Sequence, residues 1–131
     1  MNINFLLIEP NLKITEEIKK AFSHSEHPIT SFDIQNVSQE AMIAELEEFC
    51  RTEKFHFVLL ENDLTLIHGV DLMPVFSKSA IKVIAFANSY EGNWRLECAG
   101  AYAKVYKDYC YTSRGFDGNI LLKGLKDWLQ M

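Results

Sequence analysis

Four charged residues follow apolar runs of the chain and could do chemistry if the fold brings them together. Glu9 follows "INFLLI", Glu61 and Asp63 follow "FHFVLL", and Lys107 ends "AYAKVYK". Carboxylates beside an ammonium group form ion pairs, and a carboxylate with a divalent cation can accept a phosphoryl group. Which chemistry is available depends on how the surrounding elements place these residues.

Five apolar runs predict strands, and five segments with helical spacing or helix-capping residues alternate with them. The predicted strands cover residues 3–8, 29–37, 55–60, 82–87 and 101–107. The predicted helices cover residues 11–25, 38–53, 72–78, 89–101 and 117–129, with Asn11, Ser38 and Asp117 as N-caps. A long loop is expected over 109–118.

Strands that alternate with helices pair in parallel, because a parallel partner needs a crossover, which is normally a helix. Right-handed crossovers place helices on both faces of the sheet. The first, third and fourth strands are the most apolar, so we expect them at the centre. The sequence predicts one α/β domain over residues 1–131. It is a three-layer, flavodoxin-like domain with a doubly wound, five-stranded parallel sheet of order 2-1-3-4-5.

In such a sheet, ligands bind beyond the carboxyl ends of the strands, where the strand order reverses. Here that point lies between the first and third strands. Glu9 ends the first strand, Glu61 and Asp63 follow the third, Phe86 lies near the end of the fourth, and Lys107 ends the fifth. We therefore expect carboxylates and one ammonium group to meet in one crevice.

Composition limits the classes of function. The 131 residues carry a formal net charge of −5, and no dense Lys and Arg cluster predicts nucleic-acid binding. No apolar run approaches the ~20 residues needed to span a bilayer, and the N-terminus does not resemble a signal peptide. Three widely spaced cysteines, Cys50, Cys98 and Cys110, predict reduced thiols. We expect a cytoplasmic protein without nucleic-acid or membrane partners.

No other motif indicates an enzyme. The four histidines lack the spacing of metal ligands, and His24 and His27 are expected in solvent after the first helix. No GxGxxG follows a strand, and GxSxG does not occur. The motifs therefore predict neither catalysis nor a cofactor.

The strand ends resemble those of the receiver domains of bacterial response regulators, over nearly the whole chain. "LLIEPN" lies where the family has an acidic pair, and "VLLENDLTLIHG" has a glycine eight residues after the position of the phospho-accepting aspartate. "VIAFA" and "AGAYAKVYKD" correspond to the segments with the family's Thr or Ser and its lysine. The resemblance implies a CheY-like fold and a role in two-component signalling or a phosphorelay.

Several positions that the family uses for phosphoryl transfer are changed. Glu61 replaces the phospho-accepting aspartate, and Pro10 replaces the second acid, so that only Glu9 remains of the pair. Phe86 replaces the hydroxyl residue that contacts the phosphoryl group, and Lys104 replaces the switch aromatic. The resemblance therefore implies a degenerate receiver, or pseudo-receiver, that is not phosphorylated on aspartate and needs no Mg²⁺.

One hypothesis gives Glu61 the place of a phospho-aspartate. Its carboxylate would pair permanently with Lys107 and hold one signalling state, although an exposed pair contributes only ~0–1 kcal/mol. In one alternative, Glu61 is an inherited acid, paired or solvated. In another, the chain binds Mg²⁺ through Glu9 and accepts a phosphoryl group, for example on Asp63. A third is a flavodoxin-like domain that binds a small molecule.

Receivers signal through the surface formed by the fourth helix, fifth strand and fifth helix, and the resemblance places aromatic residues there. We expect a protein partner, because aromatics and arginine are enriched in interfaces. Alternatively, the tyrosines pack over the sheet edge with their hydroxyls in water. The oligomeric state and the role of the 109–118 loop stay open. The candidate interface residues are Trp94, Tyr102, Lys104, Tyr106, Tyr109, Tyr111 and Arg114.

Overall fold

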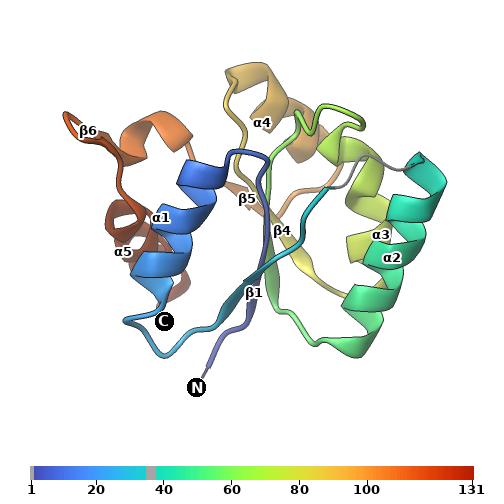
Figure 1. Cartoon of the computed structure of the whole chain (residues 1–131), viewed down its shortest axis with the longest axis horizontal. Coiled ribbons are helices and arrows are strands. Elements are labelled where there is room, and N and C mark those ends of the chain that lie inside the picture. Colours follow the sequence, from blue (N-terminus) through green and yellow to red (C-terminus); the bar gives the residue numbers. More distant parts are fainter. Residues whose placement is uncertain (1, 35–37) are drawn as a thin grey trace.

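The computed structural model describes residues 2–34 and 38–131 and contains the predicted five-stranded parallel sheet (Figure 1). The strand order is β2-β1-β3-β4-β5, which confirms the prediction. Leu7 of β1 pairs with Leu59 of β3, and Leu59 pairs with Ile84 of β4. The strands are β1 Phe5–Ile8, β2 Ile29–Ser31, β3 Phe57–Leu60, β4 Lys82–Ala85 and β5 Ala103–Lys104.

Helices cover both faces of the sheet, which confirms the three-layer architecture (Figure 1). Phe5 and Leu7 pack against α1 and α5, whereas Leu6 and Ile8 pack against α2 and α3. Because alternate residues of a strand point to opposite faces, a strand covered on both sides needs an unbroken apolar run. None of the helices in the described ranges has the length and apolarity of a membrane span. The helices are α1 Leu12–Phe22, α2 Gln39–Thr52, α3 Met73–Lys78, α4 Tyr90–Cys98 and α5 Gly118–Leu129, with the 3₁₀ turn η1 Gly69–Leu72 before α3.

The predicted N-caps begin their helices as expected. Asn11, Ser38 and Asp117 each accept a hydrogen bond from a backbone N–H of the first turn. Ser89 caps α4 in the same way, by accepting from the Gly92 N–H at 2.9 Å. These side chains satisfy N–H groups that have no partner within the helix. Of these caps, Asn11 lies in the loop that follows β1 and Ser89 in the loop that follows β4.

All five strands are shorter than predicted, and the difference is largest for β2 and β5. Beyond β4 and β5, the Ala87 N–H and the Val105 carbonyl bond to the Asn93 side chain instead of a neighbouring strand. Positions 35–37 of the second predicted strand lie outside the described residues. The predicted 29–37, 82–87 and 101–107 become Ile29–Ser31, Lys82–Ala85 and Ala103–Lys104.

The segment expected to be a loop over 109–118 contains a short antiparallel hairpin. The rings of Tyr111 and Phe116 meet edge to face across it, 5.5 Å apart, which is a stabilising cross-strand contact. The elements are η2 Lys107–Cys110, β6 Tyr111–Thr112 and β7 Gly115–Phe116.

His27 is buried, so the prediction that it lies in solvent is wrong. Only 2% of the residue is exposed, and its Nδ1 accepts a hydrogen bond from the Ile3 N–H at 3.0 Å. The imidazole thus satisfies a backbone donor just before β1, whereas His24 is exposed.

Candidate functional site

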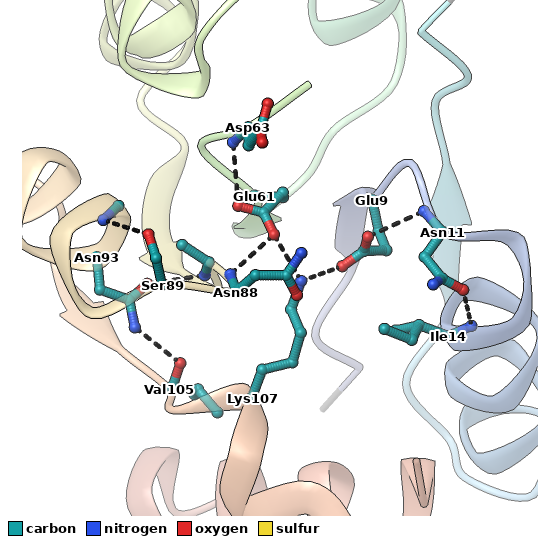
Figure 2. A network of polar contacts seen from close by, with 12 residues as sticks. Glu9, Asn11, Ile14, Glu61, Asp63, Asn88, Ser89, Asn93, Val105 and Lys107 are labelled. Atoms are coloured by element: carbon teal, nitrogen blue, oxygen red, sulfur yellow. Dashed lines mark hydrogen bonds and ion pairs between the residues drawn. The ribbon is translucent and has the colours of Figure 1, made fainter. Parts of the chain in front are cut away.

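The carboxyl ends of β1 and β3 and the segment after β5 bring Glu9, Glu61 and Lys107 together (Figure 2). Lys107 Nζ donates to Glu61 Oε1 at 2.8 Å and to Glu9 Oε1 at 2.5 Å. At most 1% of each of these side chains is exposed. The Glu61–Lys107 pair is therefore buried, and the ~0–1 kcal/mol of an exposed ion pair does not apply to it.

Every carboxylate oxygen of Glu9 and Glu61 accepts at least one hydrogen bond. Apart from the ammonium group, Glu61 Oε1 accepts from the backbone N–H of Asn88 at 2.9 Å. Glu61 Oε2 accepts from the backbone N–H of Asp63 at 3.0 Å. Glu9 Oε2 accepts from the backbone N–H of Asn11 at 3.0 Å. These donors replace the water that the carboxylates lose on burial.

Phe86 closes the cluster from the side of the sheet that packs on α1 and α5. Its ring is fully buried, and Lys107 Nζ lies 4.6 Å from the ring centroid. An ammonium group over an aromatic face is attracted by the ring quadrupole. Phe86 thus supplies a cation–π contact where the receiver resemblance has a hydroxyl group. The ammonium of Lys107 is enclosed by two carboxylates and one aromatic ring.

Gly69 allows the chain to pass close to the end of β3. A Cβ atom on Gly69 would lie 2.3 Å from the Glu61 carbonyl oxygen, which is far inside van der Waals contact. The Gly69 N–H donates to the Asn62 carbonyl at 2.6 Å, and Asn62 Oδ1 accepts from the Val70 N–H at 3.1 Å. The glycine eight residues after Glu61 therefore has a steric role in holding the strand end.

The charges of the cluster do not balance, because two carboxylates face one ammonium group. Burial has the largest effect on Glu9 and raises its pKa above the ordinary value, although the attraction of Lys107 works in the opposite direction. The neighbouring charge of Glu61 raises the pKa further. The folded protein therefore binds a proton at Glu9 more readily than the unfolded chain does.

This raised pKa predicts a pH dependence of stability. Glu9 favours the folded state fully below pH 4.5, its unperturbed pKa, and that contribution is lost as pH rises through the higher folded pKa. We expect the stability of the native protein relative to Glu9→Gln to fall as pH rises from acid to neutral. Urea unfolding of both proteins at a series of pH values measures this difference. A difference that is constant or increases with pH would contradict the prediction.

The residues of the cluster do not fit a Mg²⁺ ion. Mg²⁺ requires near-octahedral oxygen ligands, but the oxygens of Glu9 and Glu61 already accept from N–H donors, and Lys107 lies between them. Asp63 contributes its backbone N–H to the cluster, while its side chain is exposed (Figure 2). Within residues 2–34 and 38–131, no three His, Cys, Asp or Glu side chains are arranged to hold a metal ion.

Backbone and amide groups complete the site, and the sequence reasoning missed them. The Asn88 N–H and the Asn93 side chain both belong to the polar network around Glu61 (Figure 2). The residue type does not indicate which backbone N–H group will donate to the site. Asn93 is a polar residue in a weakly amphipathic helix, so its 2% exposure could not be expected from the pattern.

The structure brings only some of the candidate interface residues together. Tyr106 lies between Tyr90 and Tyr109, with ring centroids 5.4 and 5.5 Å away. Lys104 Nζ lies 5.4 Å from the Tyr106 ring and donates to Glu97 Oε1 at 3.0 Å. A hydrogen bond from Tyr90, and next the Lys104 group, lower the pKa of the Tyr106 hydroxyl. We call Tyr90, Tyr106 and Tyr109 the tyrosine stack.

Three of the other candidate interface residues lie elsewhere on the surface. Tyr102 contacts Trp128 of α5, with ring centroids 5.6 Å apart. Tyr111 packs on the β6–β7 hairpin, whose turn carries the exposed Arg114. Trp94, on the same helix as Tyr90, is 60% exposed.

No protein-family model matches the sequence, and a comparison with curated proteins gives no match. The BeF3-activated DrrB receiver domain is 19% identical, with 100% of both chains covered and a TM-score of 0.68. The signal receiver domain of a putative Luxo repressor protein from Vibrio parahaemolyticus is 15% identical, with 99% of this chain and 92% of that chain covered and a TM-score of 0.71.

A two-component response regulator from Clostridium difficile is 13% identical, with 98% of this chain and 96% of that chain covered and a TM-score of 0.73. At these identities the likeness concerns the backbone, and the chemistry of the strand ends has to be argued from the residues themselves. The chain has the CheY-like fold of response regulator receiver domains.

Proposed function

We propose that this chain is an atypical receiver domain that acts in bacterial two-component or phosphorelay signalling through protein–protein contacts. It works in the cytoplasm without catalysis, without a metal and without phosphorylation on aspartate. The observation that carries the proposal is the enclosure of the Lys107 ammonium by Glu9, Glu61 and Phe86. That contact occupies the groups that phosphoryl transfer would need, so the side chains themselves hold the domain in one state.

Glu61 satisfies the donors that an acceptor group at the end of β3 would meet. Its Oε1 accepts from both Lys107 Nζ and the Asn88 N–H, at 2.8 and 2.9 Å. A phosphoryl group would bring more charge and more acceptor oxygens. Glutamate is one methylene longer than aspartate, however, and its carboxylate reaches these donors without modification. We infer that Glu61 takes the place of a permanently modified acceptor.

The tyrosine stack and Trp94 support a surface for a protein partner. Tyr90 and Tyr109 are 76% and 78% exposed, and Trp94 is 60% exposed. Large aromatic rings in contact with one another keep little conformational freedom, so their ordering on binding costs little. Lys104 Nζ lies beside the Tyr106 ring and adds a cation to this surface.

Incubation with acetyl phosphate and Mg²⁺ tests the chemical half of the proposal. We expect no change in mass, because Mg²⁺ has no free ligands in the cluster and Phe86 offers no hydrogen bond to a phosphoryl oxygen. Intact-mass spectrometry before and after incubation gives the result. A gain of ~80 Da, the mass of one phosphoryl group, would refute the unphosphorylated state. Asp63→Asn would then show whether the exposed Asp63 is the acceptor.

A pull-down from the native cell tests the proposal that the domain acts through contact with a protein partner. We expect Tyr106→Ala and Lys104→Ala to lose a protein partner that the unchanged domain retains, because both changes alter the surface of the tyrosine stack. Lys20→Ala, an exposed change on α1, is the matched control and should retain the partner. Equal recovery of every partner by all four proteins would contradict an interface at this surface.

A further inference from the structure

Asn93 is a buried polar residue early in α4 whose side chain joins two segments of the chain (Figure 2). Its Oδ1 accepts from the Ala87 N–H at 2.8 Å, and its Nδ2 donates to the Val105 carbonyl at 3.2 Å. Helix α4 does not need this side chain as a cap, because Ser89 already accepts from the Gly92 N–H. The amide therefore connects the loop after β4 with the segment after β5.

These two segments hold the carboxylate of Glu61. Asn88 belongs to the loop after β4 and donates its N–H to Glu61 Oε1 at 2.9 Å. Lys107 belongs to the segment after β5 and donates its ammonium to the same oxygen at 2.8 Å. Hydrogen bonds and short stretches of backbone thus form a closed ring through Glu61 and Asn93. A displacement of Glu61 therefore has to be accommodated at Asn93, and a displacement of Asn93 at Glu61.

The same two segments carry two members of the tyrosine stack. Tyr90 follows the cap residue of α4, and Tyr106 lies between Val105 and Lys107. Their rings are stacked, with centroids 5.4 Å apart and planes inclined by 25°. The distance between these rings therefore depends on how the two segments are placed relative to each other.

Backbone hydrogen bonds attach the first segment to β3 and the second segment to the end of β4, from which the first segment continues. The Phe86 N–H donates to the Leu60 carbonyl of β3, and the Val105 N–H donates to the Ala85 carbonyl of β4, both at 2.8 to 2.9 Å. Asn93 bonds to both segments directly. Buried and bonded through both polar groups of its amide, it is the side chain placed to keep them in register.

We propose that Asn93 is a positioning residue that couples the Glu61–Lys107 contact to the spacing of Tyr90 and Tyr106. The inference rests on the proposed function, because it assigns the route by which the permanent Glu61–Lys107 contact sets the partner surface. Glu61→Gln removes the charge that holds Lys107 and Asn88, and with Asn93 in place this change is transmitted to the tyrosine rings. Without the Asn93 amide, the change at Glu61 is not transmitted to the tyrosine rings.

A double-mutant comparison by NMR tests the coupling. The ring resonances of Tyr90 and Tyr106 are recorded for Glu61→Gln in the native background and in the Asn93→Leu background, which keeps the side-chain bulk without the amide. We expect Glu61→Gln to shift these resonances in the native background and to have little effect in the Asn93→Leu background. Ser89→Ala is the matched control: it weakens the cap of the same helix but keeps the amide, so the full shift should remain.

The opposite results would overturn the inference. An equal shift in the native and Asn93→Leu backgrounds, or no shift in the native background, shows that Asn93 does not couple the two places. If Asn93→Leu does not fold, Asn93→Asp gives the same test, because it keeps the acceptor for Ala87 and removes the donor to Val105. The experiment uses neither phosphate nor a partner. A mass gain with acetyl phosphate would refute the proposed function. The NMR comparison would still decide whether Asn93 couples the two places.

Discussion

Replacing Lys107 with methionine is expected to lower the free energy of unfolding by about 3–5 kcal/mol, because the change leaves Glu9 and Glu61 buried without a counter-ion. Methionine has nearly the same shape as the lysine stem, so the loss measures the charge and its hydrogen bonds rather than a cavity. Urea unfolding at neutral pH, followed by circular dichroism, gives the difference. The loss should shrink in acid, where protonation of Glu9, whose pKa burial already raises, removes part of the uncompensated charge.

Lys104→Met is the matched control for this experiment. Lys104 also pairs with a glutamate, but its side chain is 35% exposed and that of Glu97 is 37% exposed. We therefore expect a loss of ~0–1 kcal/mol for this change. A loss for Lys107→Met as small as that for Lys104→Met would contradict the buried cluster.

Gly69→Ala is expected to cost about 1–3 kcal/mol, the usual effect of forcing extra volume into a closely packed place. The new methyl group would lie 2.3 Å from the Glu61 carbonyl oxygen, which is backbone and cannot move aside like the end of a side chain. Relief of this clash must shift either η1 or the end of β3. Thermal and urea unfolding measure the cost, and the amide resonances of Asn88 and Asp63 report whether Glu61 has moved.

Gly124→Ala provides a control with the opposite expected sign. Gly124 lies within α5, and a Cβ atom there would meet nothing within 4 Å. Alanine should stabilise the helix by about 0.5–1 kcal/mol, because glycine loses more backbone entropy in a helix interior. A Gly69→Ala protein as stable as the unchanged one would show that the close approach is not the reason for the glycine.

The sheet and the convergence of the charged residues could be predicted because both follow from simple periodicities. Unbroken apolar runs need cover on two faces, alternation with helices makes neighbours parallel, and parallel strands end at the same edge. Glu9, Glu61 and Lys107 could therefore be placed at one crevice from their positions after the runs. The glycine eight residues after Glu61 was visible as a spacing, although only the geometry gives its steric reason.

The closure of the site could not be predicted because it depends on contacts that residue types do not encode. The position of the Phe86 ring over Lys107 depends on how α1 and α5 pack, and the Asn88 donor is a backbone group. Whether a strand-end ion pair is exposed or buried is decided by the loops that cover it. The value for an exposed pair therefore does not apply to Glu61 and Lys107, and the burial of His27 was missed for a similar reason.

The fold of this chain is shared with receiver structures, whereas the side chains at its strand ends differ from the receiver pattern. Backbones with TM-scores of 0.68 to 0.73 are shared with receiver structures that are 13 to 19% identical. A fold can keep its architecture while the side chains at its functional edge change. Here the strand ends enclose the Lys107 ammonium between two carboxylates and the Phe86 ring on an unchanged sheet.

We infer that Lys107 occupies the cluster so fully that no external ion enters it. A crystal structure of the protein grown with Mg²⁺ and beryllium fluoride, a mimic of the phosphoryl group, tests this most directly. We predict density for neither ion at the cluster, with the Lys107 ammonium still between Glu9 and Glu61 and beneath the Phe86 ring. Mg²⁺ bound to Glu9, with Lys107 displaced toward a fluoride, would contradict the account.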